Sequence, residues 1–155
     1  MKKTTFKIQS KIDDDYIIFS LLFDGINPAE NAEYSPIVDP EILLSSYNQG
    51  ISDYLYTCGC GNEGCAGVYS ETGIIHDEAG VLFVLATPIS FSTVDDLPTN
   101  RTFNYFYVEN SNFNSELSLF AKMIIDHPEN KIEQFIGHNN SDQNKIIALS
   151  KIITR

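Results

Sequence analysis

Three cysteines lie within eight positions of this chain, and their spacing could serve metal chemistry. They are Cys58, Cys60 and Cys65, in the segment CGCGNEGCAG. Thiolates are preferred zinc ligands and structural zinc sites have four ligands, so His76 is the candidate fourth. The usual second pair of ligands is missing from the sequence. The pattern therefore leaves two interpretations: a zinc site, or small apolar cysteines packed under a glycine-rich turn.

A nucleophilic cysteine is a third interpretation, and a protein with such a cysteine, or with a carboxylate active site, would be an enzyme. Such a thiol needs a neighbouring base, for which His76, His127 and His138 are the histidines in the sequence. The segment lies in acidic surroundings, and negative charge raises the pKa of a thiol and disfavours its activation. We therefore expect a protein that is not an enzyme, with no cofactor other than zinc.

Charge is distributed unevenly along the chain, whose formal net charge is −11. Residues 12–121 contain seventeen Asp and Glu but one basic residue, Arg101, whereas the first eleven residues carry four lysines and no acid. Plain solubility is one explanation, although a solubilising surface normally interleaves both signs. Clustered acids instead raise the encounter rate with a basic partner and disfavour nucleic acid. We expect a basic protein partner and no nucleic-acid partner.

Acids in loops are the best candidates for contacts with that partner, because loops are exposed and binding groups concentrate there. The expected partner-binding residues are Asp13, Asp14, Asp15, Glu30, Glu33, Asp77, Glu78, Asp95 and Asp96. The run Asp13 to Asp15 could also bind a hard cation, but consecutive residues cannot all point at one ion. A solvated loop is the expected state of this run.

The hydrophobic pattern predicts an α+β domain over residues 1–155, since no repeat or linker divides the chain. Strands are expected at 4–9, 16–23, 53–57, 67–75, 81–87 and 102–108, with a turn at 77–80, and helices at 40–48, 115–125 and 142–154. Asp39 and Pro40 form a typical helix start. We expect a mainly antiparallel sheet of five or six strands with two or three helices packed on it. The aromatic rings of residues 103, 105, 106 and 107 are expected in the core.

The chain shows no targeting or membrane signal. Its N-terminal apolar run, residues 16–23, is far shorter than the roughly 20 residues that span a bilayer. Three cysteines, an odd number, do not fit a disulfide framework. A cytoplasmic protein without a membrane partner is expected.

Two resemblances bear on function. Residues 54–68, YLYTCGCGNEGCAGV, resemble a hairpin with the core C-x-C-G-x-x-G-C-x-G in small bacterial proteins. That resemblance implies a compact α+β domain and assigns no activity. In size and acidity the chain also resembles immunity proteins of bacterial contact-dependent growth-inhibition and related toxin systems. This second resemblance implies a protein that binds and inhibits one cognate toxin, often a basic nuclease, and it carries over no functional residue.

Overall fold

The computed structural model describes residues 2–13, 16–30, 37–47, 51–57, 68–69, 71–86, 89–90, 102–126 and 140–155. The longer strands are β1 (Phe6–Asp13), β2 (Tyr16–Phe23), β4 (Ile51–Tyr54), β7 (Glu71–His76), β8 (Gly80–Ala86) and β10 (Phe103–Glu109). The two-residue strands are β3 (Ile37–Val38), β5 (Tyr56–Thr57), β6 (Val68–Tyr69) and β9 (Ile89–Ser90). The helices are α1 (Pro40–Ser45), α2 (Asn110–Asp126) and α4 (Asn140–Ile153).

The strands form one main sheet and several smaller pairs. The main sheet has four strands in the order β10-β8-β7-β4, all antiparallel to their neighbours, and β1 pairs with β2 as a separate hairpin. Two further pairs, β3 with β5 and β6 with β9, are short. The predicted α+β class is confirmed, but the prediction of a single sheet with five or six strands is wrong. The first two strands pair with each other instead of joining the main sheet.

Side chains of α2 explain why β1 takes no second strand partner. The side-chain Oδ1 of Asn112 accepts from the Phe6 N–H at 2.8 Å, and its Nδ2 donates to the Phe6 carbonyl at 3.0 Å. One turn further along α2, Glu116 Oε2 accepts from the Ile8 N–H at 3.0 Å. These bonds satisfy the outer edge of β1, which would otherwise be open to another strand.

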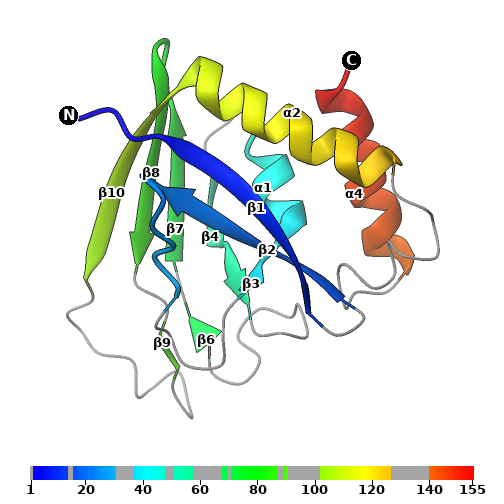
Figure 1. Ribbon diagram of the computed structural model, residues 1–155, viewed down its shortest axis with the longest axis horizontal. Helices are drawn as coiled ribbons and strands as arrows, with labels where there is room; N and C mark the ends of the chain where they lie inside the picture. Colours follow the sequence, from blue (N-terminus) through cyan, green and yellow to red (C-terminus); the bar gives the residue numbers. More distant parts are fainter. Residues whose placement is uncertain are drawn as a thin grey trace.

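The core lies between the hairpin, the main sheet and α2 (Figure 1). A group of aromatic rings in contact with one another lies within it. From the hairpin, Phe6 and Phe23 both contact Phe83 of β8, with ring centroids 5.3 and 5.2 Å apart. Phe23 also stacks on Phe106 of β10 at 4.2 Å. From α2, Phe113 contacts Phe6 and Phe83, both at 5.9 Å. One face of the main sheet is therefore filled by the hairpin and the helix.

The helices agree with the predicted helical faces but differ in their ends. At α1, Asp39 is the N-cap and its Oδ1 accepts from the Glu41 N–H at 2.9 Å, as predicted, although the helix ends at Ser45. The predicted start of the helix 115–125 is wrong, because α2 already begins at Asn110. Phe113 is buried one turn before Leu117, and that spacing extends the apolar stripe of the helix backwards.

Most of the remaining strand boundaries follow the sequence closely, but β1 runs from Phe6 to Asp13, so the predicted end of the strand 4–9 is wrong. The predicted strand 16–23 matches β2 at both ends, and β8 and β10 lie within one residue of their predicted limits. The segment 53–57 is divided into β4 and β5, and 67–75 into β6 and β7. The predicted turn at 77–80 joins β7 to β8.

Candidate functional site

The four-stranded sheet has two faces with different surroundings. Alternate residues such as Ile74, Phe83 and Phe106 point to the core, where Ile74 and Phe83 are fully buried. The opposite face carries an apolar set of six residues, which we call the outer sheet face: Ile75, Leu82, Val84, Phe103, Tyr105 and Tyr107.

Three of the six residues of the outer sheet face are exposed although they are apolar or aromatic, and the other three, Leu82, Val84 and Tyr107, are half-buried. Tyr105 is 59% exposed, Ile75 53% and Phe103 39%. The register places Tyr107, Leu82 and Ile75 in one row across three strands. The aromatic contacts of the hairpin and of α2 with β7, β8 and β10 go to His76, Phe83 and Phe106 on the inner face. Within the described residues, the outer sheet face is therefore the uncovered side of the sheet.

We expected the rings of β10 to lie in the core, and for Phe103 and Tyr105 this is wrong. The sequence correctly places residues 103, 105 and 107 on one side of the strand. It cannot tell which side faces the core, because β8 is apolar on both faces, with Leu82 and Val84 outside. No signal in the sequence distinguishes these alternatives.

Two glycines shape this surface differently. Gly73 lies beside Val84, and a Cβ there would meet the Val84 Cβ at an ordinary 3.6 Å. At Gly80, a Cβ would lie 2.4 Å from the Val108 carbonyl oxygen and 2.7 Å from Tyr107 Cζ. The Tyr107 ring therefore lies directly over Gly80, and only glycine leaves room for it.

Asp77 organises the turn at the end of this face. Its Oδ1 accepts from the N–H groups of Ala79 and Gly80, both at 2.8 Å, and from the Tyr107 hydroxyl at 3.2 Å. The bonds from Gly80 and Ala79 lower the pKa of Asp77. Partial desolvation and the hydrogen bond to Asp77 raise the pKa of Tyr107. Asp77, predicted as a partner contact, therefore has a structural role in the turn.

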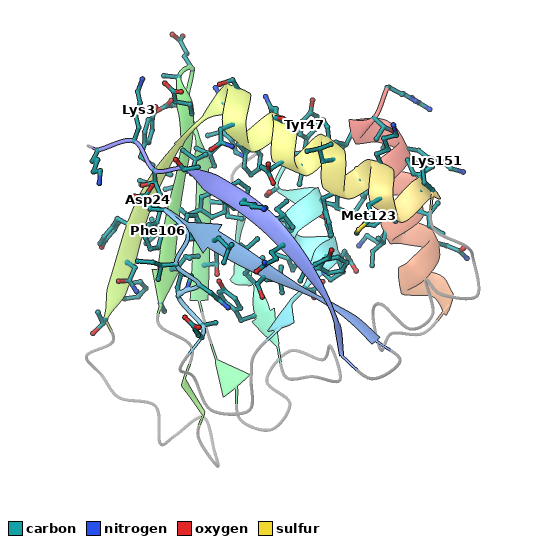
Figure 2. The ribbon with its side chains drawn as sticks, in the orientation of Figure 1. Lys3, Asp24, Tyr47, Phe106, Met123 and Lys151 are labelled. Carbon is teal, nitrogen blue, oxygen red and sulfur yellow. The ribbon has the colours of Figure 1, made fainter. Side chains whose placement is uncertain are left out.

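The charged groups around this end are mostly acidic. Glu78 is exposed in the turn, and Glu109 ends β10 in an ion pair with Lys3, whose pKa is raised by its hydrogen bond to Glu109. The side chain of Asn110 donates to the carbonyls of Asp77 and Glu78, which joins the turn to the start of α2. Figure 2 shows Lys3 on the β10 side of the molecule and Lys151 at the opposite, helical end. The outer sheet face thus has an acidic rim at one end.

Of the other predicted partner contacts, few lie in the described part. Glu30 is exposed in a turn after β2, separate from the Asp77 turn. Asp13 ends β1, where the backbone alone is described. The remaining acids lie outside the described residues and stay predictions: Asp14, Asp15, Glu33, Asp95 and Asp96.

The zinc hypothesis rests on residues that the structure describes only in part. Cys58, Cys60 and Cys65 lie outside the described residues. His76 is half-buried at the end of β7, with its ring 5.4 Å from that of Phe113. Among the described side chains, no group of three or more His, Cys, Asp or Glu could hold a metal ion.

The topology separates His76 from the ends of the cysteine segment. Tyr54 pairs with Glu71, and the described residues that flank the cysteines, Thr57 and Val68, lie beyond that end of β7. His76 is at the other end, about 17 Å along the strand at 3.3 Å per residue. A zinc site that includes His76 would require the segment to reach back along the whole of β7.

A groove lies between α2 and α4. This groove has a volume of about 690 Å³ and is lined by Leu119 and Ile153 together with Lys122, Asp126 and Arg155. It carries both signs of charge, so charge does not select a partner for it. The outer sheet face is the stronger candidate because it combines exposed aromatic rings with an acidic rim.

Comparison with known proteins found no matching family model, no matching curated protein and no matching solved structure. In the described part of the chain, no helix is long and apolar enough to cross a membrane. The candidate site therefore rests on its own geometry.

Proposed function

We propose that this protein is a non-catalytic binding protein that inhibits a basic protein partner through the outer sheet face. The partner proposed is a toxin domain, in keeping with the resemblance to immunity proteins. The observation that carries the proposal is the exposure of Phe103, Tyr105 and Ile75 on a sheet side that the described helices leave uncovered. Aromatic residues are enriched at protein interfaces, and exposed apolar patches mark interaction sites.

Charge supports the basic nature of the partner. The acids of the rim, Asp77, Glu78 and Glu109, face one end of the outer sheet face, and among them Glu109 is paired with a lysine. Such a surface attracts a cationic protein over long distances and discriminates against acidic ones. The aromatic residues would then supply the affinity and the acids the rate of association.

A co-expression assay tests the proposal. The partner to use is a basic C-terminal domain sought in the reading frames next to this gene and expressed in a host whose growth it arrests. We expect the wild-type chain to restore growth and Tyr105→Ala to fail, while Leu119→Ala, on the other side of the molecule, restores growth like the wild type. Restored growth with Tyr105→Ala and Phe103→Ala would contradict the proposed surface.

A salt titration tests the role of charge separately. We expect the association rate of the same two proteins to fall roughly tenfold or more as ionic strength rises from low to physiological values, because screening weakens the attraction between opposite fields. An association rate that does not depend on salt would refute a partner chosen by charge.

A further inference from the structure

The strand β10 forms one edge of the main sheet, as Figure 1 shows, because among the described strands its neighbour in the sheet order is β8 alone. In an antiparallel pair, residues whose N–H and C=O point to the neighbour alternate with residues that point them away. The Tyr107 carbonyl accepts from the Thr4 N–H at 2.7 Å, so Tyr107 points its backbone groups away from β8. With a period of two, Phe103 and Tyr105 do the same.

The N-terminal segment occupies only part of this edge. Lys3 forms a parallel bridge with Tyr107, and the chain then turns away into β1, which pairs with β2. Among the described residues, no hydrogen bond reaches the outward backbone groups of Phe103 and Tyr105. Two donors and two acceptors are therefore presented in a row along this part of β10.

Among the described residues, the part of the β10 edge at Phe103 and Tyr105 carries none of the usual features that block strand addition. Edge strands are normally protected by Lys, Pro, a bulge or a covering element. β10 has the sequence FNYFYVE, without lysine or proline, and its register against β8 is unbroken over seven residues. The edge of β1, by contrast, is bonded by Asn112 and Glu116. Among the described residues, the edge of β1 is therefore covered, while the edge of β10 is open at Phe103 and Tyr105.

We infer that the basic partner binds by adding an extended segment as a further strand beside Phe103 and Tyr105 of β10. Strand addition takes its affinity from backbone hydrogen bonds and its specificity from alternate side chains, which here would contact the exposed rings of Phe103 and Tyr105. Thr4 already shows that this edge accepts a strand-like segment. The inference rests on the proposed function and adds the mode of binding.

Charge argues for a basic segment and against a second copy of this chain. A second copy would bring its own net charge of −11 to the edge, and the two fields would repel. A segment that alternates basic and apolar residues would bring cations to a chain of net charge −11 and apolar side chains against the rings.

Proline substitution separates backbone pairing from side-chain contact. The N–H of Tyr105 points away from β8, so Tyr105→Pro removes an outward donor and leaves the β10–β8 hydrogen bonds in place. Tyr105→Ala is the matched control, since it removes the same ring and keeps the N–H. The pair Phe103→Pro and Phe103→Ala repeats the comparison at the second outward residue. Circular dichroism and thermal unfolding identify any variant that fails to fold.

The first probe is a capped peptide of alternating valine and lysine, about eight residues long. The peptide is titrated into the protein, and NMR records the chemical shifts of the backbone amide groups of the protein. We expect shifts centred on Phe103 and Tyr105, and roughly tenfold weaker binding of the valine–glutamate analogue. Each folded proline variant should bind the lysine peptide roughly fivefold or more weakly than its alanine control. Equal binding by the proline and alanine variants, no binding by the wild type, or shifts centred elsewhere would overturn strand addition.

The binding of the same variants to the basic domain of the growth assay distinguishes a failure of strand addition from a failure of the proposed function. If the alanine and proline variants lose its binding equally, the outer sheet face holds the partner by side chains alone and strand addition is wrong. If the alanine variants bind that domain like the wild type, the proposed function itself fails.

Discussion

Gly80→Ala should destabilise the protein through a steric conflict that Gly73→Ala does not create. The new Cβ at residue 80 would lie 2.4 Å from the Val108 carbonyl oxygen and 2.7 Å from Tyr107 Cζ. The Tyr107 ring can move, but the carbonyl belongs to the neighbouring strand, so the two strands must separate. Overpacking of this kind costs about 1–3 kcal/mol, and the contact with backbone favours the upper part of that range.

Gly73→Ala is the control because its Cβ would meet Val84 at 3.6 Å, an ordinary contact. Replacing glycine at a compatible position stabilises a protein by about 0.4–1 kcal/mol, since the unfolded chain loses freedom. We therefore expect the two variants to differ in unfolding free energy by roughly 2–4 kcal/mol. Urea unfolding monitored by circular dichroism measures this difference. Equal urea midpoints for Gly80→Ala and Gly73→Ala would refute the placement of the Tyr107 ring over Gly80.

Three further substitutions test a buried hydroxyl group and two sets of side-chain hydrogen bonds in the fold. The Tyr56 hydroxyl is buried without a hydrogen-bond partner among the described residues, so Tyr56→Phe should add about 1 kcal/mol of stability at pH 7 in urea unfolding. Burial raises the pKa of Tyr56, so the wild type should also lose stability as the pH rises above 10.0, and Tyr56→Phe should lose less. A Tyr56→Phe protein less stable than the wild type both at pH 7 and above pH 10.0 would contradict this. Asn112→Ala removes both hydrogen bonds to Phe6 and should cost about 1–3 kcal/mol, with faster hydrogen exchange at the Phe6 amide, whereas unchanged exchange would exclude the bond. Folding lowers the pKa of Asp77, so the Asp77 carboxylate stabilises the fold above its ordinary pKa of 3.8, and this stabilisation is lost as the pH falls through the pKa of the folded state. Asp77→Ala should therefore be less stable than the wild type at pH 7. Thermal unfolding should show the difference in stability shrinking in acid.

The sequence predicts the elements of the fold better than their assembly. Local signals suffice for β2, whose limits match the apolar run 16–23, and for the start of α1, where Asp39 and Pro40 fix the N-terminus. The separation of the hairpin from the main sheet depends on α2, because Asn112 and Glu116 bond the edge of β1. Those contacts join residues more than a hundred positions apart, and no local pattern encodes them.

In the candidate site, too, the local pattern is predictable from the sequence and the packing is not. Alternation places residues 103, 105 and 107 on one face of β10, as the sequence predicts. Which face is exposed depends on where the hairpin and α2 pack, and the apolar residues on both sides of β8 give no indication of it. Asp77 is exposed in its turn, as the sequence predicts, and its Oδ1 also accepts three hydrogen bonds that no local pattern indicates. Its neighbour Glu78 remains available for a partner.

The affinity of the wild type and of Tyr105→Ala for the basic domain used in the growth assay tests the central claim most directly. Isothermal titration calorimetry of the two purified proteins gives both dissociation constants. Because exposed aromatic residues at the centre of an interface carry much of its energy, we expect Tyr105→Ala to weaken binding roughly thirtyfold. Equal dissociation constants for the two proteins would contradict a partner bound on the outer sheet face.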